Sequence, residues 1–226
     1  VTGSNSLITV PVMFQFGIDE KIAVATNMFG LTFMAIGGTI PFVRAGAVEF
    51  RQVWPLAGLT AGASAIGAGL VGLITNQSIK LIVVVAMVVV VIFTLVKPDF
   101  AKRVRPEIHA AVGMAAVFFL GVYGGLYSGG YITVLTPTLV AFYGMSYAQS
   151  IAATKFINVF SSGIATIVFI WQGLVDYQLG VILGVTMFAG AYIGAHYASK
   201  MNEIWLKRIF VTSVILLAFK TTVDLI

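Results

Sequence analysis

Residues 79–96 read Ile-Lys-Leu-Ile-Val-Val-Val-Ala-Met-Val-Val-Val-Val-Ile-Phe-Thr-Leu-Val, an apolar run whose single charge, Lys80, lies near its start. Such a run is typical of a helix that crosses a bilayer, whose hydrocarbon core takes roughly 20 apolar residues per helix. Six further stretches have the same character. In chain order, the predicted spans are Glu20–Val43, Trp54–Thr75, Ile79–Val96, Ala110–Tyr127, Tyr147–Ile170, Gln178–Ala198 and Ile204–Thr222.

The composition of the whole chain agrees with this interpretation. Of 226 residues, 59% are hydrophobic and 9% are charged, whereas a typical soluble domain has about 25% charged residues. Because so few charges cannot cover a water-soluble globule, we predict an all-α, polytopic membrane helical bundle. The formal net charge of +5 belongs to the loops, so the sequence indicates no nucleic-acid partner. The absence of cysteine excludes disulfides and thiol chemistry.

The chain repeats itself at an interval of 127 residues. The run Gly46–Phe50 (GAVEF) aligns with Gly173–Tyr177 (GLVDY). The same interval relates Gly17 to Gly144, Gly67 to Gly194, and Lys80 to Lys207. A constant shift along most of a chain indicates two copies of one structural unit. The sequence therefore predicts a first repeat at 1–99, a second repeat at 110–226, and a basic cytoplasmic linker at 97–109.

Two apolar stretches, Ser6–Phe16 and Tyr131–Tyr143, are too short to cross a bilayer comfortably. Each follows a small-residue break, Gly3-Ser4-Asn5 or Ser128-Gly129-Gly130, and each contains a proline. We expect short broken or re-entrant helices here. The second repeat begins near Ala110, and its counterpart would lie about 17 residues before Val1. The sequence therefore predicts a helix of the first repeat that the printed chain lacks.

Positive charge gathers in three loops, and this predicts the topology. These loops hold nine of the thirteen lysines and arginines: Arg44 and Arg51; Lys97, Lys102, Arg103 and Arg105; and Lys200, Lys207 and Arg208. Basic loops are typical of the cytoplasmic side. With the basic loops there, the matching loops after Val43 and Ile170 face opposite sides and the C-terminus lies outside. The two repeats are thus predicted to be inverted, a plan common among secondary transporters.

Lys155 lies inside an otherwise uncharged predicted span. A lysine in hydrocarbon costs several kcal/mol unless it is paired or hydrated, so it is a candidate anion-binding group; snorkelling to a helix end is the alternative. Its repeat partner is Asn27, and a threonine precedes each of them, Thr154 and Thr26. For Asn27, the alternative is an ordinary hydrogen bond between helices.

The two breaks complete the predicted site. A short helix that starts after a break leaves free N–H groups, which together with the helix dipole favour an anion; a plain turn is the alternative. We expect both breaks, Lys155 and Asn27 to share one polar cavity near the midplane. The candidate substrate-binding residues are Ser4, Asn5, Thr26, Asn27, Ser128, Gly129, Gly130, Thr154, Lys155 and Asn158.

The remaining motifs indicate no enzyme. Ser128-Gly129 with His196 could suggest an intramembrane serine protease, but Leu126 stands where such a site has glycine. Neither HExxH nor a phosphate loop is present, so we predict no catalytic residue, metal or cofactor. Two sets of glycines are expected to be faces for close helix packing: Gly58, Gly62 and Gly69, and Gly180, Gly184, Gly190 and Gly194.

Several of these runs resemble the sulfite exporter TauE/SafE family, also called the TSUP transporters. They are Ile22–Asn27 (IAVATN), Ile36–Gly38 (IGG), Arg44–Val48 (RAGAV) and Gly144–Lys155 (GMSYAQSIAATK). The resemblance covers nearly the whole chain. It implies a bacterial or archaeal inner-membrane carrier of sulfur-containing anions, such as sulfite or organosulfonates. In that family the first helix leads into a glycine-rich break and a proline-containing short helix, of which Gly3 to Pro11 is the tail.

We therefore expect a secondary transporter that moves a small sulfur-containing anion across the inner membrane by alternating access. A non-transporting assembly factor or receptor subunit is the alternative. The expected partners are the small anion and the lipid bilayer, while a coupling ion and a homo-oligomer are left open.

Overall fold

The computed structural model describes residues 5–96 and 109–198, together with the single positions 212, 215, 216, 219, 221 and 223. Every regular element in these residues is a helix, which confirms the all-α bundle. The helices are α1 (Ser6–Gln15), α2 (Glu20–Arg44), α3 (Phe50–Leu73), α4 (Asn76–Val96), α5 (His109–Leu126), α6 (Tyr131–Tyr143), α7 (Tyr147–Trp171) and α8 (Tyr177–Ala198). Ser4 and most of the predicted linker and last span lie outside the described residues.

Three of these helices, α2, α3 and α7, are long and apolar enough to cross a membrane, and the other five carry shorter apolar stretches. The predicted short helices are present as α1 and α6. One boundary is corrected: the expected loop at 76–78 is the first turn of α4. The hydroxyl of Thr75 accepts a hydrogen bond from the Ser78 N–H, at 3.2 Å. Polar residues therefore cap this helix rather than delay its start.

Local structure recurs at the 127-residue interval. Gly46 and Gly173 follow the ends of α2 and α7 with φ of 65° and 68°, a left-handed conformation that glycine adopts without strain. Gly17 and Gly144 do the same after α1 and α6, with φ of 75° and 64°. The side chains of Asp19 and Ser146 accept hydrogen bonds from the first backbone N–H groups of α2 and α7. The repeat seen in the sequence thus marks equivalent helix ends.

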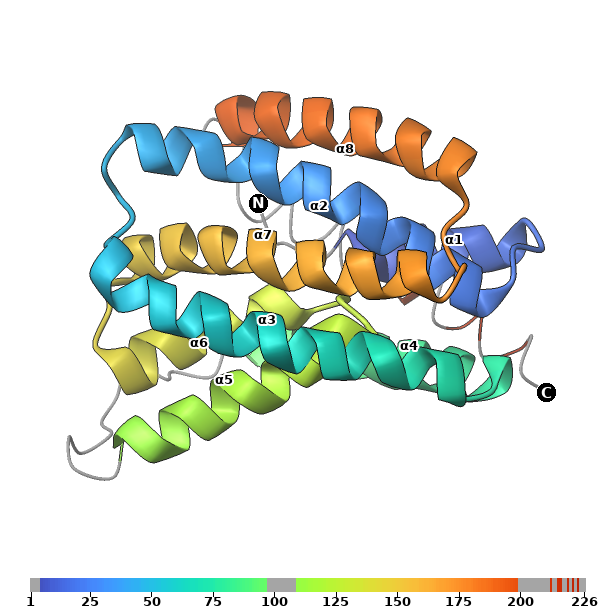
Figure 1. The fold of residues 1–226 in the computed structure, drawn as a ribbon, viewed down its shortest axis with the longest axis horizontal. Coiled ribbons are helices and arrows are strands. Elements are labelled where there is room, and N and C mark those ends of the chain that lie inside the picture. Colours follow the sequence, from blue (N-terminus) through green and yellow to red (C-terminus); the bar gives the residue numbers. More distant parts are fainter. Residues whose placement is uncertain are drawn as a thin grey trace.

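Helices of the two halves interlock. Figure 1 shows α8 lying along α2, and α7 running close to α3. The α2–α8 pair is parallel, because Phe29 contacts Tyr177 and Gly37 faces the ring of Phe188 further along both helices. The α3–α7 pair is parallel too. Trp54, near the start of α3, packs on Phe160 of α7, and the carbonyl of Gly69, near the end of α3, accepts a hydrogen bond from the Gln172 amide just after α7.

The equivalent helices α2 and α7 run antiparallel. Gly38, late in α2, faces the stem of Lys155, early in α7. Nearer the middle of α2, the hydroxyls of Thr32 and Thr166 are 3.0 Å apart. Two inverted copies of one unit would place α2 antiparallel to its equivalent, α7. They would also allow each of these helices to pack on a helix of the other half, as α2 does on α8 and α7 does on α3. The inversion of the two halves stays a prediction.

Glycines bring α3 and α5 into backbone contact, but they are not the ones expected from the sequence. A Cβ on Gly67 would collide with the Val122 carbonyl, and one on Gly125 with the Ser64 backbone. The three glycines expected to pack on α3 all have open space beside them, so that prediction was wrong: Gly58, Gly62 and Gly69. Their spacing satisfied the small-residue pattern, but the rotation of the helix turns Gly67 to the neighbour instead.

On α8, Gly180 and Gly184 pack as expected, against Phe29 and Phe33, whereas Gly190 has open space beside it.

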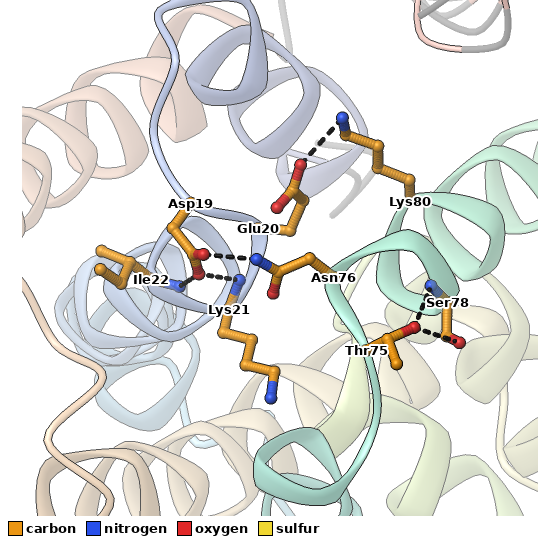
Figure 2. Close-up of polar contacts among 8 residues, drawn as sticks. All are labelled: Asp19, Glu20, Lys21, Ile22, Thr75, Asn76, Ser78 and Lys80. Atoms are coloured by element: carbon orange, nitrogen blue, oxygen red, sulfur yellow. Dashed lines mark hydrogen bonds and ion pairs between the residues drawn. The ribbon is translucent and has the colours of Figure 1, made fainter. Parts of the chain in front are cut away.

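Polar contacts fasten the start of α2 to the turn between α3 and α4 (Figure 2). Asp19 caps α2 and also accepts a hydrogen bond from the Asn76 amide. Lys80 pairs with Glu20 at 2.9 Å, and the Lys21 ammonium donates to the Gly72 carbonyl at 3.2 Å. This network closes one end of the first half. Lys80 and Glu20 pair with each other, whereas Asp19 and Lys21 bond to uncharged amide and carbonyl groups.

Candidate functional site

A buried polar cluster lies where α1, α2 and the break before α6 meet; we call Ser6, Asn27, Tyr127 and Ser128 the Asn27 cluster. The Asn27 amide nitrogen donates to the Ser6 hydroxyl at 2.8 Å. The hydroxyls of Ser6 and Ser128 are 2.7 Å apart, and the Tyr127 hydroxyl donates to the Ser6 carbonyl at 3.0 Å. All four side chains are buried, with Asn27 only 1% exposed. The predicted break and Asn27 are thus brought together.

The break itself is built tightly. Gly130, directly before α6, has a φ of 82°, and a Cβ there would collide with Val90 of α4. Gly129 faces the ring of Tyr127 in the same way, and its carbonyl accepts a hydrogen bond from the Tyr123 hydroxyl. Glycine is therefore required by backbone conformation at Gly130 and by space at both positions.

A second group of residues lies about two turns into α7; we call Gly38, Thr136, Thr154 and Lys155 the Lys155 cluster. The Lys155 stem lies against Gly38, where an added Cβ would be 3.9 Å from its Cδ. The Thr136 hydroxyl donates to that of Thr154 at 3.3 Å. Eight residues separate Lys155 from Tyr147, the first residue of α7, which places its Cα roughly 12 Å along the helix.

No carboxylate within the described residues pairs with Lys155. The acidic residues of this part of the chain lie at or just before the starts of helices: Asp19, Glu20, Glu49 and Asp176. The ion pair found there joins Lys80 and Glu20. A charge inside a span is costly without a counter-ion or water. Lys155 therefore remains a candidate anion-binding group.

The two clusters lie apart, contrary to the single cavity expected from the sequence. Lys155 packs at Gly38, which is eleven residues beyond Asn27 on α2, or roughly 16 Å along the axis. The reason is that α2 and α7 are antiparallel. Equivalent residues then meet only at the crossing near Thr32 and Thr166, whereas Asn27 and Lys155 both lie in the first third of their helices.

Other candidate residues take different positions. The Thr26 hydroxyl accepts a hydrogen bond from the Asp176 N–H at 3.0 Å, which ties α2 to the start of α8. The Asn5 carbonyl accepts the first hydrogen bonds of α1. Asn158 is buried one turn after Thr154 on α7.

Sequence reasoning missed Ser6, Tyr127 and Thr136. A signal for Ser6 was present, because a polar residue begins an otherwise apolar short helix.

An open groove of about 390 Å³ lies between α2 and α7, but its chemistry does not suit an anion. Phenylalanine and aliphatic side chains form most of its walls: Phe29, Phe33, Val159, Phe160, Ile164 and Ile167. Its two hydroxyls, those of Thr32 and Thr166, bond to each other. The polar clusters are thus better candidates for binding an anion than this apolar groove.

Comparison with known proteins shows the family of this chain. A family model described as "Sulfite exporter TauE/SafE" matches residues 1–221. The chain belongs to the sulfite exporter TauE/SafE family. A TauE/SafE-family relative from Sinorhizobium, named a probable membrane transporter protein, is 26% identical over 99% of this chain and 87% of its own length. Similar proteins of the same description occur in Haemophilus influenzae, at 24% identity over 100% and 88%, and in Escherichia coli K12, at 23% over 96% and 82%.

No solved structure matches the chain. As a TauE/SafE-family member with apolar helices of membrane-spanning length, the protein is a membrane transporter and not an enzyme. The expected family, fold class and transporter class are confirmed.

Proposed function

We propose that this TauE/SafE-family protein is a secondary carrier that moves a small sulfur-containing anion across the inner membrane by alternating access. The anion would be sulfite, an organosulfonate or a similar oxyanion. The observation that carries this proposal is Lys155, a basic side chain within a span that has no carboxylate partner in the described structure. An arriving anion would lower the cost of that charge, which a neutral or cationic substrate could not do.

The two polar clusters support a route rather than a single pocket. Both lie on helices that contact each other, and roughly 16 Å of α2 separates them. In the proposed cycle the Lys155 cluster neutralises the anion near one membrane face. The Asn27 cluster, beside the buried break before α6, receives it nearer the other face. Opening the two clusters in turn would give alternating access.

The orientation belongs to the same proposal. If the basic loop that contains Arg44 and Arg51 is cytoplasmic, the Lys155 cluster lies in the cytoplasmic half, because it faces the last turns of α2. The Asn27 cluster then lies in the outer half.

Flux measurement on the purified chain tests the function. Proteoliposomes that contain only this protein should accumulate labelled sulfite or a labelled organosulfonate above the level of protein-free liposomes. Acetate and choline serve as a sulfur-free anion and a cation, and neither should be accumulated. Absence of protein-dependent flux for every sulfur-containing anion would contradict the proposal.

A further inference from the structure

The Asn27 side chain has an unused acceptor. Its amide nitrogen donates to Ser6, but its oxygen Oδ1 is buried and has no hydrogen-bond partner among the described residues. A buried acceptor left unsatisfied costs about 1–3 kcal/mol. Such an atom within a polar cluster points to a missing donor, since the neighbouring serines are already engaged with the amide nitrogen and with each other.

The serine hydroxyls leave the complementary group, an unused donor. Ser6 and Ser128 have two hydroxyl hydrogens between them. One of these hydrogens forms the 2.7 Å bond between the two oxygens. The Ser6 oxygen already accepts from Asn27, so the other hydrogen lies outside these two bonds, and it forms no further hydrogen bond among the described residues. The cluster therefore presents one donor and one acceptor to a guest.

Charge around the cluster favours an anion as that guest. No ionised side chain belongs to the Asn27 cluster. The cluster lies at the first residue of α1 and just before α6, so the positive ends of two helix dipoles are near it. The guest must then be negative overall and must also donate a hydrogen bond to Asn27.

We propose that the Asn27 cluster selects, among small sulfur-containing anions, those that carry their own hydrogen-bond donor. Suitable guests are a protonated oxyanion with an O–H group, or an alkyl sulfonate with a hydroxyl or ammonium group. The sulfonate oxygens accept from the free serine hydroxyl, and the guest's donor binds Asn27 Oδ1. This inference rests on the proposed function and names the chemistry that its substrate must have.

Two sulfonates of equal charge isolate the donor: 2-hydroxyethanesulfonate and ethanesulfonate, which differ by one hydroxyl. Their labelled forms are compared as substrates in proteoliposomes. Their stabilisation of the purified protein against heat gives a binding readout that does not need transport. Sites built to bond a substrate hydroxyl discriminate strongly against the analogue that lacks it. The wild type should therefore prefer the hydroxylated compound about ten-fold or more.

The variant Asn27→Leu has no acceptor and should bring that preference close to one, while Thr166→Val, a control outside both clusters, should retain it. If the wild type handles the two sulfonates equally, or if Asn27→Leu keeps the preference, the inference is overturned although anion transport stands. The wild-type comparison remains decisive even if Asn27→Leu does not fold.

If neither sulfonate is bound or carried, the inference also fails, and uptake of sulfite then decides the proposed function separately. Equal, weak stabilisation by both would mean that water occupies the cluster, which likewise overturns it.

Discussion

At the scale of single residues, the structure distinguishes polar side chains that connect helices from polar side chains that keep an unpaired hydrogen-bonding atom. Thr26 and Asn27 are neighbours in the sequence, yet Thr26 holds the start of α8 and Asn27 keeps an unpaired oxygen. Sequence alone could identify both as polar residues in a span. It could not show what each of them bonds to. The partner of Thr26 lies 150 residues away along the chain, and that of Asn27 lies 21 residues away.

Tyr127 provides a test of the Asn27 cluster at this scale. Replacing Tyr127 with Phe removes the side-chain donor to the Ser6 carbonyl at the start of α1. The expected cost is that of one buried hydrogen bond, about 0.5–1.5 kcal/mol of unfolding free energy, measured by thermal unfolding in detergent. The variant Tyr177→Phe is the matched control, since its side chain is exposed and its loss should change stability little. Equal unfolding temperatures for the two variants would show that the Tyr127 bond contributes nothing.

At the scale of helices, most elements could be predicted from the sequence, and the contacts between them could not. Hydropathy identified α2 to α5, α7 and α8 within a few residues, and the glycine breaks located α1 and α6. The choice among glycines failed on α3 because Gly58, Gly62 and Gly69 cannot be told from Gly67 in a pattern of small residues. Only the packed structure shows that α5 lies against Gly67.

This difference predicts a contrast between two glycine-to-alanine changes in α3. Gly67→Ala forces its Cβ into the Val122 carbonyl and should push α5 away, with an expected loss of about 1–3 kcal/mol from overpacking. Gly62→Ala adds its methyl to open space and should be neutral or slightly stabilising, because alanine favours helix. Thermal unfolding of the two purified variants measures both effects. A Gly62→Ala protein that is the less stable of the pair would contradict the packing of α3 on α5.

At the scale of the whole molecule, the repeat explains the antiparallel α2–α7 pair and the exchange of partners with α3 and α8. The 127-residue interval was visible in the sequence, and the same helix-end glycines carry it in the structure. The meeting point of the halves was not visible, because it depends on where α2 and α7 cross. This is why one shared cavity was expected, whereas the structure has two clusters.

If the two halves are inverted, equivalent positions of the two repeats lie on opposite sides of the membrane. The chain has no cysteine, so single cysteines can report the membrane side without further changes. Arg51 and Gln178 lie 127 residues apart, each is the second residue of its helix (α3 or α8), and both are exposed. In intact cells, a membrane-impermeant maleimide should label Gln178→Cys and leave Arg51→Cys unlabelled until the membrane is opened. Labelling of both from one side would rule out inversion.

The central claim is that Lys155 neutralises an anion during transport, and one flux measurement tests it most directly. Initial uptake of labelled sulfite is compared in proteoliposomes that contain equal amounts of correctly inserted wild type, Lys155→Met and Lys80→Met. Methionine keeps much of the lysine stem and removes its charge. Loss of a charged interaction worth about 1.5–3 kcal/mol should lower uptake by Lys155→Met roughly ten-fold or more, while Lys80→Met, which breaks only the partly exposed Glu20 pair, should transport nearly as the wild type does. Uptake by Lys155→Met at the wild-type rate would contradict the account.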